Sequence, residues 1–212
     1  MDTTKFRVDP EELLNSRQKF GLTENDLVLI VVARLDPEKD VELAIRTALS
    51  MDDADIVLLV VGDGKERSRL EKLVNDQPSR TRIIFLGLLK DTRSAYAVSD
   101  FLLQTSRAPN LGTVVLEAMA CCTPVVIAYR DEDEYRMAID TFDGLDLGPI
   151  SEAKPEAIAA AILDLYADQS RYQALRHKVR SFIEKRHSRA LVYPGLAQAY
   201  ASLENNNWKR QE

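Results

Sequence analysis

Short apolar runs alternate with longer segments of helical period along the first two thirds of the chain. Each run is five or six residues long, rich in β-branched side chains and without an alternating polar face, as is typical of strands that helices cover on both faces. The runs are Leu27–Val32, Ile56–Val61, Arg82–Leu86, Asp100–Gln104 and Pro124–Ala128. The intervening segments that are long enough for crossover helices are Val41–Ser50, Lys65–Asn75, Thr92–Val98 and Thr113–Cys121. This alternation predicts an α/β fold with a doubly wound, mainly parallel sheet.

The last third of the chain has helical period and no convincing strand. We expect extra C-terminal helices at Pro155–Ala167, Arg171–Lys185 and Ser188–Leu203. Pro194 is expected to bend or interrupt the last of these helices. The tail that follows has one large apolar side chain, Trp208, and is expected to be disordered. The sequence therefore predicts one Rossmann-like domain over residues 1–203 and a tail at 204–212.

The charge balance excludes a protein that coats a polyanion. The 28 Lys and Arg residues against 34 Asp and Glu residues give a formal net charge of -6, so no overall positive field is available to nucleic acid. Apolar runs long enough to cross a bilayer are absent, and the polar start MDTTKFRVDPEE lacks the apolar core of a signal peptide. We expect a cytoplasmic protein with no nucleic-acid partner and no transmembrane segment.

Cysteine and histidine usage argues against a metal centre. Cys121 and Cys122 are adjacent, a spacing that strains a mutual disulfide and supplies too few thiolates for a structural zinc site. His177 and His187 both lie in a stretch of helical period rich in Lys and Arg. The sequence therefore predicts neither a bound metal nor a histidine-based catalytic triad.

A loop with two cations follows the first predicted strand, at the end of the sheet where open parallel sheets bind ligands. Arg34 and Lys39 lie five residues apart in this loop, which opens a helix. Arginine can grip phosphate oxygens with two hydrogen bonds, lysine adds a point charge and the helix N-terminus adds a positive dipole, so the loop can hold a diphosphate. The alternative is a pair of solvated cations balanced by Asp36, Glu38 and Asp40.

Glycines follow the second and third strands. The triplet Gly62-Asp63-Gly64 permits either close backbone approach to a ligand or a plain tight turn. The triplet Gly87-Leu88-Leu89 offers an apolar ledge that suits the face of a nucleotide base and suits ordinary core equally well. The pattern alone does not separate these interpretations.

The segment after the fourth strand carries the most candidate residues. Gly112 and Thr113 begin a helix, where unpaired backbone N–H groups can bind an anion. Glu117 lies one turn into this mostly apolar helix, where a carboxylate is costly unless it meets a partner such as a ribose diol or a cation. The alternative is a glutamate satisfied by the N-terminal turn or by a nearby arginine.

Four segments, taken in order, carry a family resemblance. They are DTTKF at residues 2–6, ARLDPEKDVELAI at 33–45, VVGDGKE at 60–66 and LEAMACCTPVV at 116–126. Their order and spacing resemble the C-terminal, nucleotide-sugar-binding domain of family 4 (group 1) retaining glycosyltransferases, which is one half of a GT-B fold. The resemblance covers nearly the whole chain.

This resemblance implies a donor site and an activity. Arg34 and Lys39 would hold the donor diphosphate and act as the catalytic cations, Glu117 would accept hydrogen bonds from the ribose, and Leu88 or Leu89 would flank the base. Enzymes of this kind move a sugar, here a hexose, from a nucleotide diphosphate to an acceptor with retention of configuration, with no metal or other cofactor. The donor-binding residues expected on this basis are Arg34, Lys39, Gly62, Leu88, Leu89, Asn110, Leu111, Gly112, Thr113 and Glu117.

The sequence departs from the family pattern at four places. The family has two glutamates separated by seven residues, and Pro109 stands at the earlier position. Ala33, Cys122 and the segment Tyr129-Arg130-Asp131-Glu132 stand where the family usually has glycines. Two interpretations stay open: a donor-binding domain for a divergent donor, or a noncatalytic domain with a degenerate donor site that serves in binding or assembly.

The resemblance also implies a partner domain. Complete transferases of this fold have an N-terminal domain that carries the acceptor site, and the chain starts where the second domain would start. The helix at Ser188–Leu203 resembles the one that crosses back to that domain. We therefore expect the isolated chain to be inactive, and the complete enzyme to reach the inner membrane surface, if at all, through the N-terminal domain.

Overall fold

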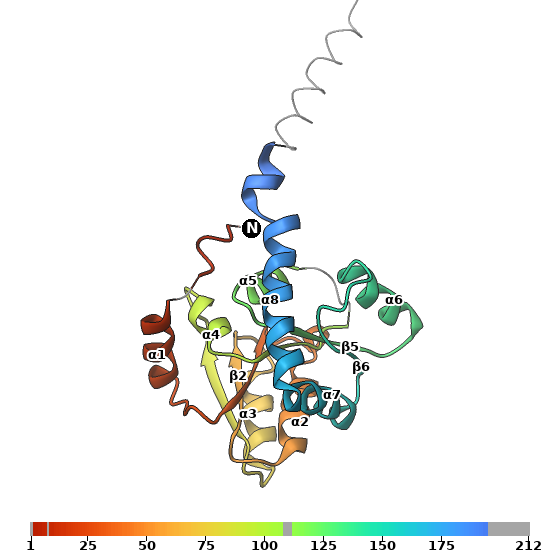
Figure 1. Cartoon of the computed structure of the whole chain (residues 1–212). Helices are drawn as coiled ribbons and strands as arrows, with labels where there is room; N and C mark the ends of the chain where they lie inside the picture. The colour runs from red at the N-terminus through yellow and green to blue at the C-terminus, as the bar shows by residue number, and fades with distance from the viewer. Residues whose placement is uncertain (1, 8, 108–111, 195–212) are drawn as a thin grey trace, which may run out of the picture.

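The computed structural model describes residues 2–7, 9–107 and 112–194 (Figure 1). Its centre is a six-stranded, all-parallel sheet with the order β3-β2-β1-β4-β5-β6. The strands are β1 (Leu27–Val32), β2 (Ile56–Val61), β3 (Arg82–Gly87), β4 (Phe101–Gln104), β5 (Val125–Tyr129) and β6 (Ile150–Glu152). The prediction of a doubly wound parallel sheet is confirmed, and each of the five predicted strands is found with its ends within one residue.

Helices pack on the sheet in two groups. They are α1 (Pro10–Lys19), α2 (Val41–Met51), α3 (Arg67–Asn75), α4 (Arg93–Ala97), α5 (Thr113–Ala120), α6 (Glu132–Thr141), α7 (Pro155–Ala167) and α8 (Gln169–Arg186), with a 3-10 turn η1 (Pro37–Lys39). Helix α2 packs against α7, whereas α5 packs against α8 and α4, and α4 packs against α1. Right-handed crossovers in this strand order put these two groups on opposite faces of the sheet.

The two central strands explain why the apolar runs lack a polar face. β1 and β2 pair in register from Leu27 opposite Ile56 to Val32 opposite Val61. All six residues of β2 are buried, because helices cover the sheet on both sides. One hydrophobic cluster joins these strands to the facing helices.

Two helices and one strand were not predicted. Helix α1 begins after Asp9, whose carboxylate accepts the Glu12 N–H at 2.8 Å, and α6 begins after Asp131, whose carboxylate accepts the Glu134 N–H at 2.9 Å. Both are side-chain N-caps. Strand β6 has three residues at the edge of the sheet, too few to show a pattern.

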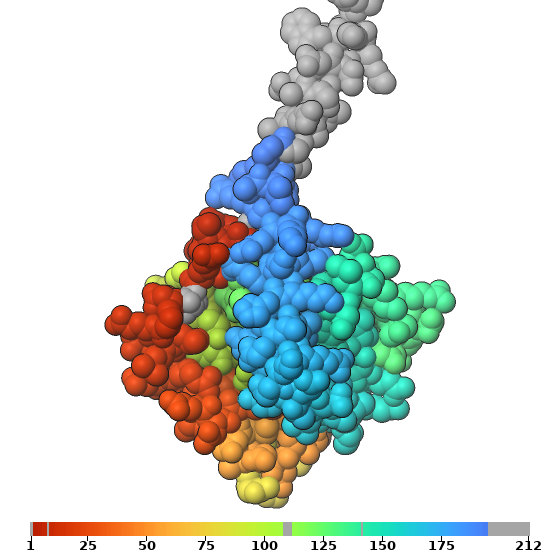
Figure 2. Space-filling model, in the orientation of Figure 1, coloured from red at the N-terminus to blue at the C-terminus, as the bar shows by residue number. Residues whose placement is uncertain are grey.

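The first residues of the chain lie against α8 (Figures 1 and 2). The Arg180 guanidinium, on α8, donates to the carbonyl oxygens of Thr3 at 2.7 Å and Phe6 at 2.8 Å, and it also contacts the carbonyl of Ala120 at the end of α5. Arg180 therefore joins the N-terminal segment, α5 and α8.

The C-terminal region is described as far as Pro194. Residues 189–194 are helical, which agrees with the start of the helix predicted at Ser188–Leu203. The remainder of that helix and the tail at 204–212 lie outside the described residues. Within the described part of the chain, helices long and apolar enough to cross a membrane are absent.

Candidate functional site

A cavity of about 230 Å³ lies at the carboxyl ends of β1 and β4. These neighbouring strands lead to crossovers in opposite directions, which is the switch point where doubly wound sheets bind ligands. The lining residues are Val31, Val32, Ala33, Arg34, Lys39, Leu103, Gln104, Thr105, Ser106, Gly112, Thr113 and Val114. The structure thus brings together four of the residues expected from sequence, namely Arg34, Lys39, Gly112 and Thr113.

Arg34 reaches the cavity from the end of β1 and is held by its own loop. Its guanidinium contacts the carboxylates of Asp36 and Glu38, each at 2.7 Å, and its side chain is 68% exposed. The Glu38 side chain is exposed as well, and exposed ion pairs of this kind contribute roughly 0–1 kcal/mol to stability. An anion in the cavity can therefore displace Glu38 from Arg34 at little cost.

Lys39 ends the turn η1 and has a well-anchored backbone. Its N–H donates to the Asp36 carbonyl at 3.0 Å, and its own carbonyl accepts the Thr105 hydroxyl at 3.1 Å. Among the described residues, its ammonium group has no carboxylate within ion-pair distance. Its charge is therefore available to an anion in the cavity.

The start of α5 presents unpaired backbone donors to the same cavity. Gly112 is the N-cap, with extended backbone and no side-chain hydrogen bond that caps the helix. The N–H groups of the first turn point out of the helix start, which carries a partial positive charge. Arg34, Lys39 and this helix terminus together form an anion-binding arrangement.

Glu117 lies outside the lining of this cavity, one turn further along α5. Its carboxylate is half-buried and accepts the Tyr96 hydroxyl at 3.2 Å. Burial raises the pKa of Glu117 above the ordinary value of 4.5, and the Tyr96 hydrogen bond opposes this shift in part. Thr113 and Glu117 share one helix face at an i, i+4 spacing, so a ligand seated at the helix start lies within one turn of the carboxylate.

We expect Glu117→Gln to melt at the wild-type temperature or above it at pH 7. Because the folded pKa of Glu117 is raised, its stabilising effect is fully present below pH 4.5 and is lost as the pH rises through the folded pKa. Glutamine resembles the protonated acid, so thermal melts at several pH values should show the advantage of the variant shrinking as the pH falls through the folded pKa toward 4.5, and staying constant below it. Binding of ribonucleotides should weaken more than binding of analogues without ribose hydroxyls. A lower melting temperature with equal losses for both ligands would make Glu117 a structural residue.

The other expected residues are placed differently. Leu88 is 78% exposed and Leu89 is half-buried against the core, so an apolar ledge is present after β3. Gly62 is explained by backbone packing, because a Cβ there would lie 1.8 Å from the Ala33 carbonyl oxygen. Asn110 and Leu111, together with Pro109, lie outside the described residues. The roles of all these residues in ligand binding stay predictions.

Sequence reasoning missed the residues that anchor the wall of the cavity. Arg130 follows β5 and hydrogen-bonds both Asp40 and the Thr105 carbonyl. The sequence marked Arg130 only as a residue where the family usually has glycine. The acidic residues that follow Arg130 in the sequence could have indicated a buried ion pair, because they form the N-cap and the first turn of α6.

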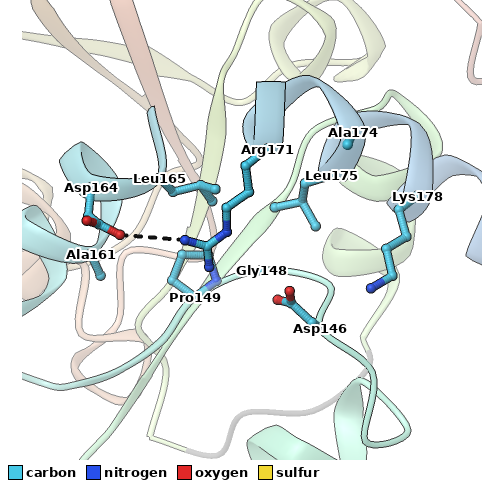
Figure 3. Close-up of a pocket in the computed structure, with 10 residues that line it drawn as sticks. All are labelled: Asp146, Gly148, Pro149, Ala161, Asp164, Leu165, Arg171, Ala174, Leu175 and Lys178. Carbon is cyan, nitrogen blue, oxygen red and sulfur yellow. Dashed lines mark ion pairs between the residues drawn. The ribbon is translucent and has the colours of Figure 1, made fainter. Parts of the chain in front are cut away.

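A second cavity, of about 320 Å³, opens between the segment before β6 and helices α7 and α8 (Figure 3). Because it adjoins the amino end of β6, it lies away from the carboxyl ends of the strands. The Arg171 guanidinium and Asp164 carboxylate are 3.6 Å apart, and Lys178 and Asp146 also line the cavity (Figure 3). These two cations and two carboxylates balance, so this cavity lacks the positive excess that suits a diphosphate. Groups of three or more His, Cys, Asp or Glu side chains able to hold a metal are absent from the part of the chain that is described.

Comparison with known protein families assigns the chain to a family. Residues 14–185 match the family described as "Glycosyl transferases group 1". The chain belongs to the group 1 glycosyltransferases. The family match covers both the loop after β1 and α5.

Curated relatives of this glycosyltransferase chain are longer than it is. It is 31% identical over 122 residues to N-acetyl-alpha-D-glucosaminyl L-malate synthase of Bacillus anthracis, which covers 57% of the chain and 31% of that relative. It is 29% identical over 191 residues to GDP-mannose-dependent alpha-(1-6)-phosphatidylinositol monomannoside mannosyltransferase of Mycolicibacterium smegmatis, which covers 82% of the chain and 47% of that relative. The chain thus spans less than half the length of these two relatives.

Solved structures share the fold of this glycosyltransferase chain. Anabaena HepE in complex with UDP and glucose superposes with a TM-score of 0.79 at 21% identity, over 95% of this chain and 55% of the other. The C-terminal domain of a glycosyl transferase group 1 family protein (LpcC) from Francisella tularensis superposes with a TM-score of 0.71 at 18% identity, over 89% of this chain and 99% of the other. At these identities the superpositions show the fold alone.

Proposed function

We propose that this chain is the donor-binding domain of a retaining glycosyltransferase that moves a hexose from a nucleotide diphosphate to an acceptor. The observation that carries the proposal is the cavity at the switch point of the sheet, where Arg34, Lys39 and the open start of α5 converge in a group 1 glycosyltransferase. Two cations and a helix N-terminus suit a diphosphate.

The relatives and neighbours support this assignment of the domain. HepE, with the same fold, was solved with UDP and glucose, and the domain of similar size from Francisella tularensis is named a C-terminal domain. The relative from Mycolicibacterium smegmatis is named as GDP-mannose-dependent. Because the chain spans less than half of its curated relatives, we place the acceptor site on an N-terminal domain of the complete enzyme.

The proposed chemistry uses the protein's own positive groups. As the donor splits, negative charge builds up on the departing diphosphate. Arg34, Lys39 and the N–H groups at the start of α5 can stabilise that charge by preorganised hydrogen bonds, the work that a metal ion does elsewhere. Glu117 would hold the ribose hydroxyls, and Leu88 or Leu89 would flank the base.

The proposed enzyme works in the cytoplasm. The relative from Mycolicibacterium smegmatis is named for a phosphatidylinositol-linked mannoside. A lipid-linked acceptor of that kind would bring the complete enzyme to the inner surface of the membrane through its N-terminal domain.

Calorimetry of the chain against UDP, GDP and ADP, each with and without its sugar, tests the proposal. Binding of one of these nucleotides supports a working donor site and identifies the base. Because Pro109 stands where the family has a glutamate, the attached sugar is expected to improve the affinity little. Failure to bind any of them contradicts the proposed function and favours the noncatalytic alternative, a domain with a degenerate donor site.

Arg34→Ala and Lys39→Ala are each expected to weaken nucleoside diphosphate binding by about 1.5–3 kcal/mol, the usual effect of losing a charged hydrogen bond. The matched nucleoside lacks phosphates, so its affinity should stay within experimental error. Calorimetry on both ligands measures the difference. Equal losses for nucleoside and nucleotide would mean that these residues support the fold or touch the base.

A further inference from the structure

The position of Lys39 depends on contacts that other strands supply. Its carbonyl accepts the Thr105 hydroxyl, and Thr105 is the first residue after β4. The preceding carbonyl, of Glu38, accepts the Arg107 N–H at 3.0 Å. The loop after β1 is therefore held from the loop after β4.

The Arg130 guanidinium completes this connection from β5. Its Nη2 donates to Asp40 Oδ2 at 2.6 Å and to the Thr105 carbonyl oxygen at 2.8 Å. Asp40 directly follows Lys39 and has a left-handed backbone, with φ +46°, which a non-glycine residue adopts only at some cost. Arg130 Nη2 therefore hydrogen-bonds both Asp40, which follows Lys39, and Thr105, whose hydroxyl donates to the Lys39 carbonyl.

Arg130 is itself fixed in place. The Glu134 carboxylate accepts the Arg130 backbone N–H at 2.8 Å and its Nη1 at 3.2 Å. Glu134 lies in the first turn of α6, whose N-cap Asp131 accepts the Glu134 N–H. Side-chain exposures of 20% for Arg130 and 12% for Glu134 show that this ion pair is largely shielded from solvent.

We infer that Arg130 is a positioning residue that holds Lys39 in the cavity for the donor diphosphate. The inference rests on the proposed function, in which Lys39 binds the donor diphosphate. It adds that donor affinity also depends on Arg130, a residue outside the cavity lining. Arg130 acts through Asp40 and Thr105 and does not touch the donor. The network joins the segments that follow β1, β4 and β5, so it fixes the loop that carries both cations relative to the segment after β4.

Hydrogen exchange and ligand binding test the inference together. Arg130→Gln should raise exchange at the Lys39 and Asp40 amides by about tenfold or more relative to amides in the centre of β1, because the loop opens locally. Affinity for the nucleoside diphosphate and for inorganic pyrophosphate should fall about tenfold, with the nucleoside unchanged. Arg136→Gln is the matched control, because Arg136 lies on the same helix α6, is 69% exposed and pairs only with Glu132 among the described residues.

A conservative variant separates positioning from general stability. Lysine at position 130 keeps a charge for Asp40 but cannot also reach Thr105 and Glu134, so Arg130→Lys should show a smaller effect in the same direction. If Arg130→Gln fails to fold, Arg130→Lys is used in its place. Hydrogen exchange at the Lys39 and Asp40 amides that is as slow in Arg130→Lys as in the wild type would then overturn the inference.

The outcomes distinguish this inference from the proposed function. If the wild-type chain binds neither nucleotide nor pyrophosphate, the proposed function fails whatever the exchange shows. If it binds them and Arg130→Gln leaves exchange or affinity unchanged, the positioning role alone is overturned. A uniform rise of exchange across the sheet would also overturn it, because Arg130 would then be a general stabiliser.

Discussion

Gly62→Ala is expected to lower the free energy of unfolding by at least about 3 kcal/mol. Gly62 has φ +132°, a conformation that side chains rarely adopt, and a Cβ there would lie 1.8 Å from the Ala33 carbonyl oxygen. That oxygen belongs to the backbone, so the clash is relieved only by moving the loop that leads to Arg34. Urea unfolding measures the effect.

Gly21→Ala is the matched control for backbone strain without a clash. Gly21 has φ +68° and nothing within 4 Å of the position that a Cβ would take. We expect it to cost only about 1 kcal/mol. Similar losses for the two variants would show that the close approach of Gly62 to Ala33 is unimportant for stability.

Sugar transfer by the isolated chain is expected to be undetectable, although the chain binds nucleotide. Transfer requires an acceptor hydroxyl aligned with the anomeric carbon of the donor, and such alignment can be worth about 10⁵-fold or more in rate. In the proposed enzyme, the acceptor site lies on a separate N-terminal domain. Release of free nucleotide from a donor sugar, with a defined acceptor present, measures transfer.

Lys39→Ala provides the background for that assay, because it removes a proposed catalytic cation. Nucleotide release that is equal in wild type and Lys39→Ala counts as background. Release that is clearly faster in wild type and depends on the acceptor would show that these 212 residues carry both sites, and the proposed division of labour would be wrong.

The strands were predictable because two-sided burial leaves a continuous apolar run, as in β2. The two missed helices had a local signal in their N-caps. Asp9 is followed by Pro10 and then Glu12, and Asp131 is followed by Glu134 three residues later, both typical of helix starts. Both α1 and α6 are acidic in the first turn, so their apolar residues are too few to show a clear helical period in the sequence.

The predicted part of the cavity follows from topology alone. Arg34 and Lys39 follow β1, Gly112 and Thr113 follow the segment after β4, and parallel neighbours bring their carboxyl ends together. The role of Arg130 could not be predicted in this way, because it depends on the reach of one side chain across two neighbouring loops.

One departure from the family pattern has a visible structural setting. Cys122 has φ +62°, a left-handed conformation that glycine adopts freely and that other residues adopt at a cost. The sequence could show that a glycine is replaced there. Only the structure shows that the backbone conformation is still the one that favours glycine.

The contacts of Arg180 and Arg189 hold the N-terminal segment against the C-terminal helical region. Asp2 and Arg189 approach to 4.0 Å, and the Arg180 guanidinium donates to the Thr3 carbonyl at 2.7 Å. Because Thr3 and Arg180 are 177 residues apart, this hydrogen bond closes a loop that spans most of the described chain. The entropy cost of that closure must be offset by the packing of the whole domain, so the N-terminal segment is expected to come loose whenever that packing is weakened.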